Sequence, residues 1–187
     1  MSMPTLKRRW TFDDIQALPD DGNRYEVIDG ELFVTPAPSY RHQAAVSELH
    51  ALLREYLSGL RVGYPFFSPA DVVFSPTRAV QPDIFVVPLV NGRRPERFED
   101  VNRLLLAIEV LSPSTARADR VAKRTLFRQE SVDEYWIVDM DSRTLERSTP
   151  GDPRVEVLDE QLSLRPDGAP TELRIDLPAY FSRVLDG

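Results

Sequence analysis

A glutamate lies inside the most apolar stretch of this chain. Residues 104–111 read Leu-Leu-Leu-Ala-Ile-Glu-Val-Leu, so Glu109 interrupts a continuous apolar run. Such a run is typical of a strand that is buried on both faces. A carboxylate at that place is costly unless it is paired, protonated or bound to a metal. Glu109 is therefore a candidate for a metal or catalytic role, and a structural ion pair with an arginine is the alternative.

A second carboxylate, Asp83, follows Pro82 and precedes the apolar stretch Ile84–Val87. Proline at the first position of a strand is tolerated, so the aspartate is expected at the end of that strand, where a site can form. If the two strands are neighbours, both carboxylates can reach one hard cation. Magnesium typically takes one or two carboxylates together with water and phosphate. The pair therefore predicts a Mg²⁺ or Mn²⁺ site.

A lysine completes the set of residues that could do chemistry. Lys123 is the only lysine of a helix expected over residues 115–130. At 100° per residue, four arginines of that helix share one outward stripe, away from Lys123: Arg117, Arg120, Arg124 and Arg128. Lys123 could therefore place its ammonium near the carboxylates. The alternative is a surface lysine paired with Asp119 one turn earlier.

Turn and cap signals indicate the elements that must position these residues. Thr11 is a predicted N-cap of a short helix, and Asp29-Gly30 predicts a hairpin between strands 24–28 and 31–35. Ser39 is the predicted N-cap of the longest helix, which ends near residue 58. Further strands are expected at 66–74, 83–87, 104–111, 135–139, 144–148, 155–158 and 172–175, and a last helix at 177–185. The order over residues 39–139 is helix, three strands, helix, strand.

Composition narrows the class of protein. The chain has 187 residues, no cysteine and a formal charge of -7. We expect one domain over 1–187, without disulfides or thiolate metal sites, in the cytoplasm and with no membrane partner. The negative charge excludes a protein that coats nucleic acid by general attraction, so contact with DNA must come from local arginines. Arg93, Arg94 and Arg97 form one such cluster. No glycine-rich phosphate loop or histidine zinc site is present in the sequence.

Several short motifs together resemble a known group of enzymes. The segments that carry the resemblance are Arg24–Glu31, Pro36–Ser39 with His42, Gln81–Asp83, Glu109–Thr115, Asp119 with Lys123, and Glu134–Asp139. They resemble the PD-(D/E)XK restriction-endonuclease-like superfamily, and more closely its Uma family of endonucleases. The resemblance covers nearly the whole chain up to the C-terminal strands.

The resemblance implies an α/β fold with a restriction-endonuclease-like mixed β-sheet core in αβββαβ order. It implies flanking helices, an N-terminal hairpin and extra C-terminal strands. It also implies an endonuclease that hydrolyses DNA with Mg²⁺ or Mn²⁺. Asp83, Glu109 and the backbone carbonyl of Val110 would bind the metal, and Lys123 would be the catalytic lysine. Leu111 occupies the superfamily's usual lysine position, and the Uma family takes its lysine from the following helix.

Other matching residues receive accessory roles from the same resemblance. Glu31 would be a third carboxylate near the metal, or else an exposed hairpin glutamate. His42 lies on the apolar face of the long helix, where a histidine that is satisfied within the core is the alternative. Gln81 and Asp119 are the remaining accessory residues. Arg117, Arg120, Arg124, Arg93 and Arg94 are the candidates for binding nucleic acid.

Three other functions stay open at the level of sequence. The fold could be a non-catalytic module that binds DNA or protein, with structural ion pairs at the carboxylates. The site could hydrolyse a small phosphodiester. The chain could also act mainly as an assembly subunit that dimerises through its C-terminal strands, and a homodimer is compatible with a nuclease. Fold analogy alone does not decide among them.

Overall fold

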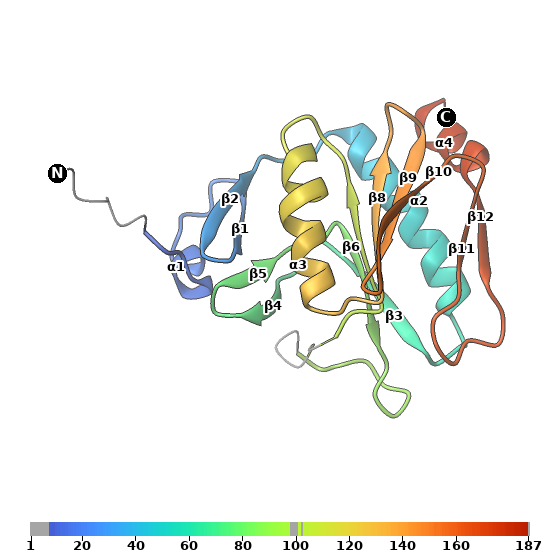
Figure 1. Ribbon diagram of the computed structural model, residues 1–187, viewed down its shortest axis with the longest axis horizontal. Helices are drawn as coiled ribbons and strands as arrows, with labels where there is room; N and C mark the ends of the chain where they lie inside the picture. The colour runs from blue at the N-terminus through green and yellow to red at the C-terminus, as the bar shows by residue number, and fades with distance from the viewer. Residues whose placement is uncertain (1–7, 98–100, 102, 187) are drawn as a thin grey trace.

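A six-stranded mixed sheet forms the centre of the molecule (Figure 1). The computed structural model describes residues 8–97, 101 and 103–186. The strands lie in the order β10-β9-β8-β7-β6-β3. Their bounds are β3 Gly63–Phe67, β6 Ile84–Pro88, β7 Leu106–Val110, β8 Glu134–Asp139, β9 Thr144–Thr149 and β10 Asp152–Leu158. Strands β7 and β8 are parallel and the other neighbours are antiparallel, which confirms the predicted mixed sheet.

Helices cover both faces of this sheet. Helices α2 (Tyr40–Leu57) and α4 (Leu177–Leu185) pack on one face, and the Tyr180 hydroxyl donates to the carbonyl of Ala45 at 2.9 Å. The helix that carries Lys123 packs on the other face, in front of the sheet in Figure 1. Ser39 caps α2 by accepting from the backbone N–H of His42. From α2 to β8, the helices and the strands of the six-stranded sheet therefore follow one another in the predicted αβββαβ order.

Smaller elements flank the central sheet. The predicted hairpin, β1 (Arg24–Ile28) and β2 (Glu31–Thr35), belongs to a four-stranded sheet with β4 (Val72–Ser75) and β5 (Arg78–Val80). Helix α1 (Phe12–Gln16) begins after a capping box at Thr11, as predicted. A separate hairpin joins β11 (Gln161–Leu164) to β12 (Leu173–Asp176). No helix in the described part of the chain is long and apolar enough to cross a membrane.

Two predictions of secondary structure are wrong. The single strand expected at residues 66–74 is broken, because β3 ends at Phe67 and β4 begins at Val72 in the other sheet. Pro69 lies in the gap, and proline has no N–H with which to continue a ladder. Strands β5 and β11 were not expected at all. Strand β5 has three residues and β11 has four, and a long turn separates β11 from its partner β12.

The helix expected over residues 115–130 has an unexpected internal geometry. It begins with a π-helical segment, Ala118–Lys123, and continues as α3, Arg124–Gln129. The N–H of Arg124 donates to the carbonyl of Asp119, five residues earlier. A π-helical turn holds more residues than an α-helical turn. The angular positions derived from 100° per residue are therefore wrong over this segment.

Candidate active site

The register of the sheet brings the two predicted carboxylates together. Ile84 of β6 lies opposite Ile108 of β7 in the antiparallel pair. One step further along both strands places Asp83 beside Glu109, and paired residues point their side chains to the same face. The backbone N–H of Val110 donates to Asp83 Oδ2 at 2.9 Å, which ties the end of β6 to β7. Both carboxylates are only 2 % exposed.

Lys123 reaches these carboxylates from the helix that packs on one face of the sheet. Its side chain is 4 % exposed, and Nζ lies 2.9 Å from Glu109 Oε1 and 2.9 Å from Glu26 Oε2. Asp119 Oδ1 lies 3.6 Å from the same nitrogen. The π-helical segment turns both Asp119 and Lys123 toward the sheet, so both are buried. One ammonium therefore faces three carboxylates.

Glu26 is a site residue that the sequence reasoning missed. It comes from β1, is 2 % exposed, and its Oε1 accepts from the backbone N–H of Gln81 at 2.8 Å. The signal that singled out Glu109 is also present here, since Glu26 is an acidic residue between Tyr25 and Val27 in a β-rich run. The hairpin therefore contributes an anchor for Lys123.

The carboxylate of Asp83 is surrounded by positively charged side chains and hydrogen-bond donors. Arg24 NH1 donates to Asp83 Oδ1 at 2.9 Å, and His42 Nε2 lies 3.0 Å from Oδ2. Burial raises the pKa of Asp83. The hydrogen bond and charge of His42, the charge of Arg24 and the N–H of Val110 outweigh burial and lower this pKa from 3.8 to about 2. Asp83 is therefore a carboxylate at any ordinary pH.

Glu109 lies among other carboxylates, and its pKa shifts in the opposite direction to that of Asp83. Burial raises its pKa well above the usual value of 4.5, and the nearby carboxylates Asp83, Asp119 and Glu26 raise it further, while Lys123 opposes them. The pKa of Asp119 is raised in the same way, first by burial. Burial disfavours the ammonium of Lys123, but attraction by Glu109, Glu26 and Asp119 outweighs it and raises the lysine pKa. Lys123 therefore keeps its charge.

A cleft of about 610 Å³ opens onto this cluster. Asp83, Glu109, Val110 and Lys123 line its floor together with Arg24 and His42, and three loops form its walls: 35–39, 111–116 and 139–142. In this solvent-connected cleft the lysine ammonium can stabilise negative charge on a substrate, and the two carboxylates can take up a cation.

The family model described as "Uma2: Putative restriction endonuclease" matches residues 12–178. The chain belongs to the Uma2 family. A crystal structure titled as a "putative nuclease belonging to DUF820" from Anabaena variabilis ATCC 29413 has a similar fold. Its TM-score is 0.77 at 23% sequence identity, over 94% of this chain and 99% of that chain, which supports the fold. No curated protein matches. Family membership supports a nuclease-like function.

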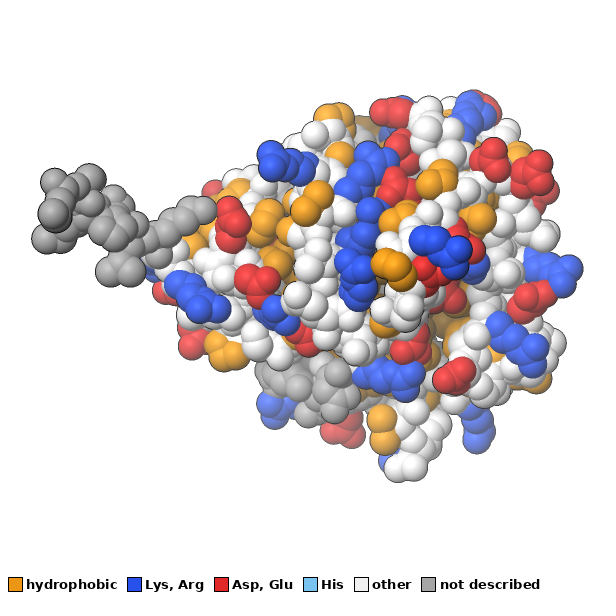
Figure 2. Space-filling view, in the orientation of Figure 1, with side chains coloured by type: hydrophobic (Ala, Val, Ile, Leu, Met, Phe, Trp, Pro, Cys, Tyr) orange, Lys and Arg blue, Asp and Glu red, His pale blue; other side chains and the backbone are white. Residues whose placement is uncertain are grey.

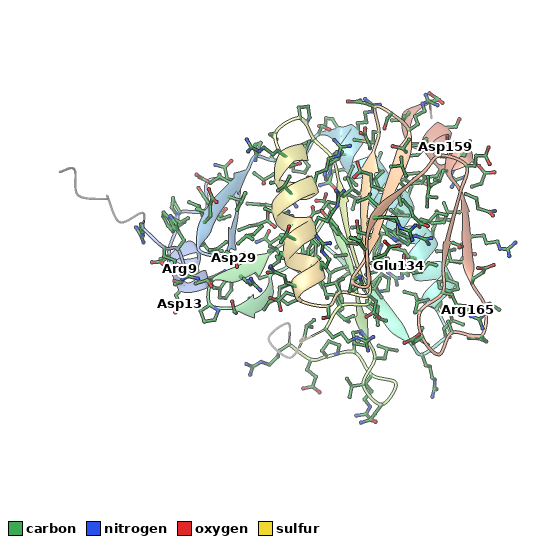
Figure 3. The ribbon with its side chains drawn as sticks, in the orientation of Figure 1. Arg9, Asp13, Asp29, Glu134, Asp159 and Arg165 are labelled. Carbon is green, nitrogen blue, oxygen red and sulfur yellow. The ribbon has the colours of Figure 1, made fainter. Side chains whose placement is uncertain are left out.

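Not every residue predicted for the Uma2 site joins the cluster. Glu31 is exposed, opposite Ile28 beside the hairpin turn, so Glu26 and not Glu31 is the hairpin's carboxylate at this site. The turn residue Asp29, labelled in Figure 3, accepts from Arg78 Nε at 2.6 Å at the edge next to β5. The backbone N–H of Gln81 donates to Glu26, and its side-chain amide donates to Asp71 at 2.9 Å and not to the cluster.

The predicted arginines fall into three groups. Arg117 and Arg128 are exposed. Figure 2 shows a column of Lys and Arg side chains between α3 and strands β8 and β9. Arg120 is held by Glu146 at 2.7 Å and Asp139 at 2.9 Å, and Arg124 also pairs with Glu146. Arg93 and Arg94 line a separate cavity, where Arg94 lies 4.6 Å over the ring of Tyr64. The four helix arginines therefore do not form one free outward stripe.

The charges of the cluster fit a divalent cation. Four buried carboxylates, Glu26, Asp83, Glu109 and Asp119, are contacted by two permanent cations, Lys123 and Arg24. Both oxygens of Asp119 are buried without a hydrogen-bond partner. No three His, Asp or Glu side chains of the described residues converge as a metal-holding group. Asp83 and Glu109 both line the cleft, and such a pair fits an ion of the magnesium type, which takes few carboxylates and keeps water.

Proposed function

We propose that this chain is a divalent-metal-dependent endonuclease that hydrolyses phosphodiester bonds of DNA. The observation that carries the proposal is the meeting of Asp83, Glu109 and a buried, charged Lys123 at one cleft. Membership of the Uma2 family supports nuclease chemistry. The alternative of purely structural ion pairs does not account for an open cleft that exposes a floor of two buried carboxylates and a lysine.

Asp83 and Glu109, with the carbonyl oxygen of Val110, are the proposed ligands of Mg²⁺ or Mn²⁺. Such an ion, when bound, acts as a Lewis acid toward the phosphate and lowers the pKa of its water. Glu109 must be ionised to serve as a ligand, and its contact with Lys123 favours that form. Asp83 needs no such help, because its pKa is already low.

Lys123 is proposed as an electrostatic group and not as a general base. Its pKa is raised, so it carries a proton throughout the neutral range and cannot accept one. A fixed ammonium in a water-poor site stabilises charge that develops on the phosphoryl oxygens. Glu26 and Asp119 hold the ammonium in place from two sides. These two residues are positioning residues in the proposal.

Contacts to the DNA backbone are assigned to arginines at the surface. Arg117 is exposed beside the cleft wall, and Arg120 lines the cleft itself. Arg93 and Arg94 lie on a different loop and extend the basic surface. Each phosphate that is neutralised releases counterions, so DNA binding should weaken steeply with salt. A DNA affinity that does not change with salt concentration would contradict this role for the arginines.

The deciding experiment combines calorimetry with cleavage. Mn²⁺ binding is titrated into the wild type and into the Asp83→Ala, Glu109→Ala and Glu31→Ala variants, and nicking of supercoiled plasmid is assayed on the same samples. We expect one class of Mn²⁺ site and nicking in the wild type and in Glu31→Ala, and loss of both in the other two variants. Circular dichroism confirms that each variant is folded.

Two other results would change the assignment. Mn²⁺ binding without cleavage of either plasmid or single-stranded DNA would overturn DNA as the substrate, and hydrolysis of bis-p-nitrophenyl phosphate by the same samples would then indicate small phosphodiesters. Absence of specific Mn²⁺ binding would overturn catalysis and indicate a nuclease-like fold used as a binding module. The homodimer stays a prediction that light scattering on the purified chain measures.

A further inference from the structure

Two cavities meet at Asp83. The catalytic cleft lies on one side, and a second cavity of about 290 Å³ lies on the other. Arg24, Pro38, His42 and Asp83 line both cavities and form the wall between them. A substrate that is a chain of phosphodiesters has residues on both sides of the bond that is cut. The second cavity is thus positioned for the neighbouring residue of such a chain.

Arg24 in this wall is incompletely satisfied. NH1 donates to both Asp83 Oδ1 at 2.9 Å and Ser68 Oγ at 3.0 Å, but Nε is buried and has no hydrogen-bond partner. The side chain is 19% exposed. A cation that draws on the oxygens of Asp83 would weaken the ion pair and leave a guanidinium in partly buried surroundings, which is costly. A phosphate accepts two parallel N–H bonds from the guanidinium fork and restores its charge balance.

The second cavity has the chemistry of a nucleobase site. Two amide side chains, those of Asn23 and Gln43, line it, and Val46 and Pro69 supply apolar walls. Amides can pair with the donor and acceptor edge of a base, as Asn and Gln do with adenine. The volume lies near the lower end for ligand pockets, about 300 Å³, and suits one nucleoside rather than a base pair.

We infer that the second cavity holds the nucleotide adjacent to the scissile phosphate, and that Arg24 binds the phosphate between the two cavities. The inference rests on the proposed function and specifies its substrate class. A base can enter a cavity of this size only when it is unpaired, so the substrate is single-stranded or locally unpaired DNA. Asn23 and Gln43 are the residues that contact its edge.

The first test fills the cavity. Gln43→Trp places an indole in it, and Ser47→Trp places one on the same helix, one turn further and outside the lining. Both are made in the otherwise wild-type chain, and binding of a fluorescent 12-nucleotide single strand is measured by anisotropy with Ca²⁺ in place of Mg²⁺, to keep a cation present while slowing cleavage. We expect Gln43→Trp to weaken binding by roughly tenfold or more and Ser47→Trp by less than about twofold. Equal affinities in the two variants would overturn the subsite.

The second test separates a phosphate contact from a structural one. Arg24→Ala should weaken binding of the single strand by roughly ten- to hundredfold and reduce the slope of log affinity against log salt by about 0.7. Arg183→Ala, on α4 and paired with Glu48, should leave both quantities unchanged. Arg24→Lys keeps the charge without the fork and should restore the salt slope but only part of the affinity. If Arg24 only holds Asp83, the slope will not change in Arg24→Ala, which would overturn its phosphate role.

The two proposals fail in different ways. A wild type that binds Mn²⁺ but cuts neither plasmid nor single strand overturns the proposed function. A wild type that cuts DNA, with a Gln43→Trp variant that binds and cuts equally well, overturns the subsite alone. We expect the wild type to bind the single strand more tightly than the matching duplex, and the reverse preference would also overturn the subsite.

Discussion

The site has two halves, one around Asp83 and one around Glu109, and the neighbouring groups shift the pKa of these two carboxylates in opposite directions. Around Asp83, Arg24, His42 and a backbone N–H all favour the ionised carboxylate, and its pKa falls to about 2. Around Glu109, three other carboxylates crowd one ammonium, and the pKa rises well above 4.5. Both carboxylates are equally buried. Burial alone therefore does not set the charge of a buried acid, because the sum of its neighbours decides it.

This difference gives the halves different tasks. The Asp83 half is already neutralised, so its anion is fixed in place before any substrate arrives. The Glu109 half gathers several acidic groups around one ammonium, so an added cation is stabilised there more than beside Asp83. Variants that change one half and leave the other intact test this difference.

The largest effect is expected from Lys123→Met. The change removes the ammonium that contacts Glu26, Glu109 and Asp119, and leaves buried carboxylates without a partner. We expect a loss of about 3–5 kcal/mol in the free energy of unfolding, measured in urea at pH 7. Arg128→Ala, exposed on the same helix, should change it by less than about 0.5 kcal/mol. A loss below about 1 kcal/mol for Lys123→Met would mean that the lysine does not hold the Glu109 half together.

Asp83→Asn tests the Asp83 half through the dependence of stability on pH. The folded pKa of Asp83 is below the ordinary 3.8, so the unfolded chain binds more protons between the two values. The stabilisation by this carboxylate is therefore fully present above about pH 5 and is lost as the pH falls through about 2. We expect the wild type to exceed Asp83→Asn by about 2 kcal/mol at pH 6, with the gap closing toward pH 2. A gap that stays constant in urea melts across this range would contradict the lowered pKa.

Glu26→Gln distinguishes the buried hairpin carboxylate from the exposed one. Glu26 accepts from Lys123 and from the backbone N–H of Gln81, whereas Glu31 is exposed. We expect Glu26→Gln to cost about 1–2 kcal/mol of stability and Glu31→Gln less than about 0.5 kcal/mol, from thermal unfolding followed by circular dichroism. Plasmid nicking should fall only in Glu26→Gln. Equal behaviour of the two variants would remove Glu26 from the site.

Glu109→Gln is expected to have the smallest effect on stability and the opposite dependence on pH. The folded pKa of Glu109 is raised, so the folded chain binds more protons than the unfolded one above pH 4.5. Stability from this group is complete below that pH and declines as the pH rises. Glutamine cannot ionise, so the variant should lie within about 1 kcal/mol of the wild type at pH 7 and improve relative to it toward pH 9. A difference without pH dependence would contradict the raised pKa.

Much of the local structure could be predicted because its signals are local. Thr11 and Ser39 cap their helices as predicted, because a side chain that bonds the first free N–H groups needs no distant partner. The Asp29-Gly30 turn likewise sets its own hairpin, with Asp29 and Gly30 at positive φ angles. The broken strand at Pro69 and the π-helical segment at 118–123 were not predicted, because sheet membership and helix winding depend on packing against other elements.

Three candidate site residues could be read from the sequence: a glutamate in an apolar strand, an aspartate after proline and one lysine in the following helix. Folding was needed to show that Glu26, and not Glu31, contacts that lysine, and that Arg24 and His42 surround Asp83. Residue type and burial tendency are properties of the local chain. A pKa depends on charges a few ångströms away, and these come from strands and helices that only folding brings together.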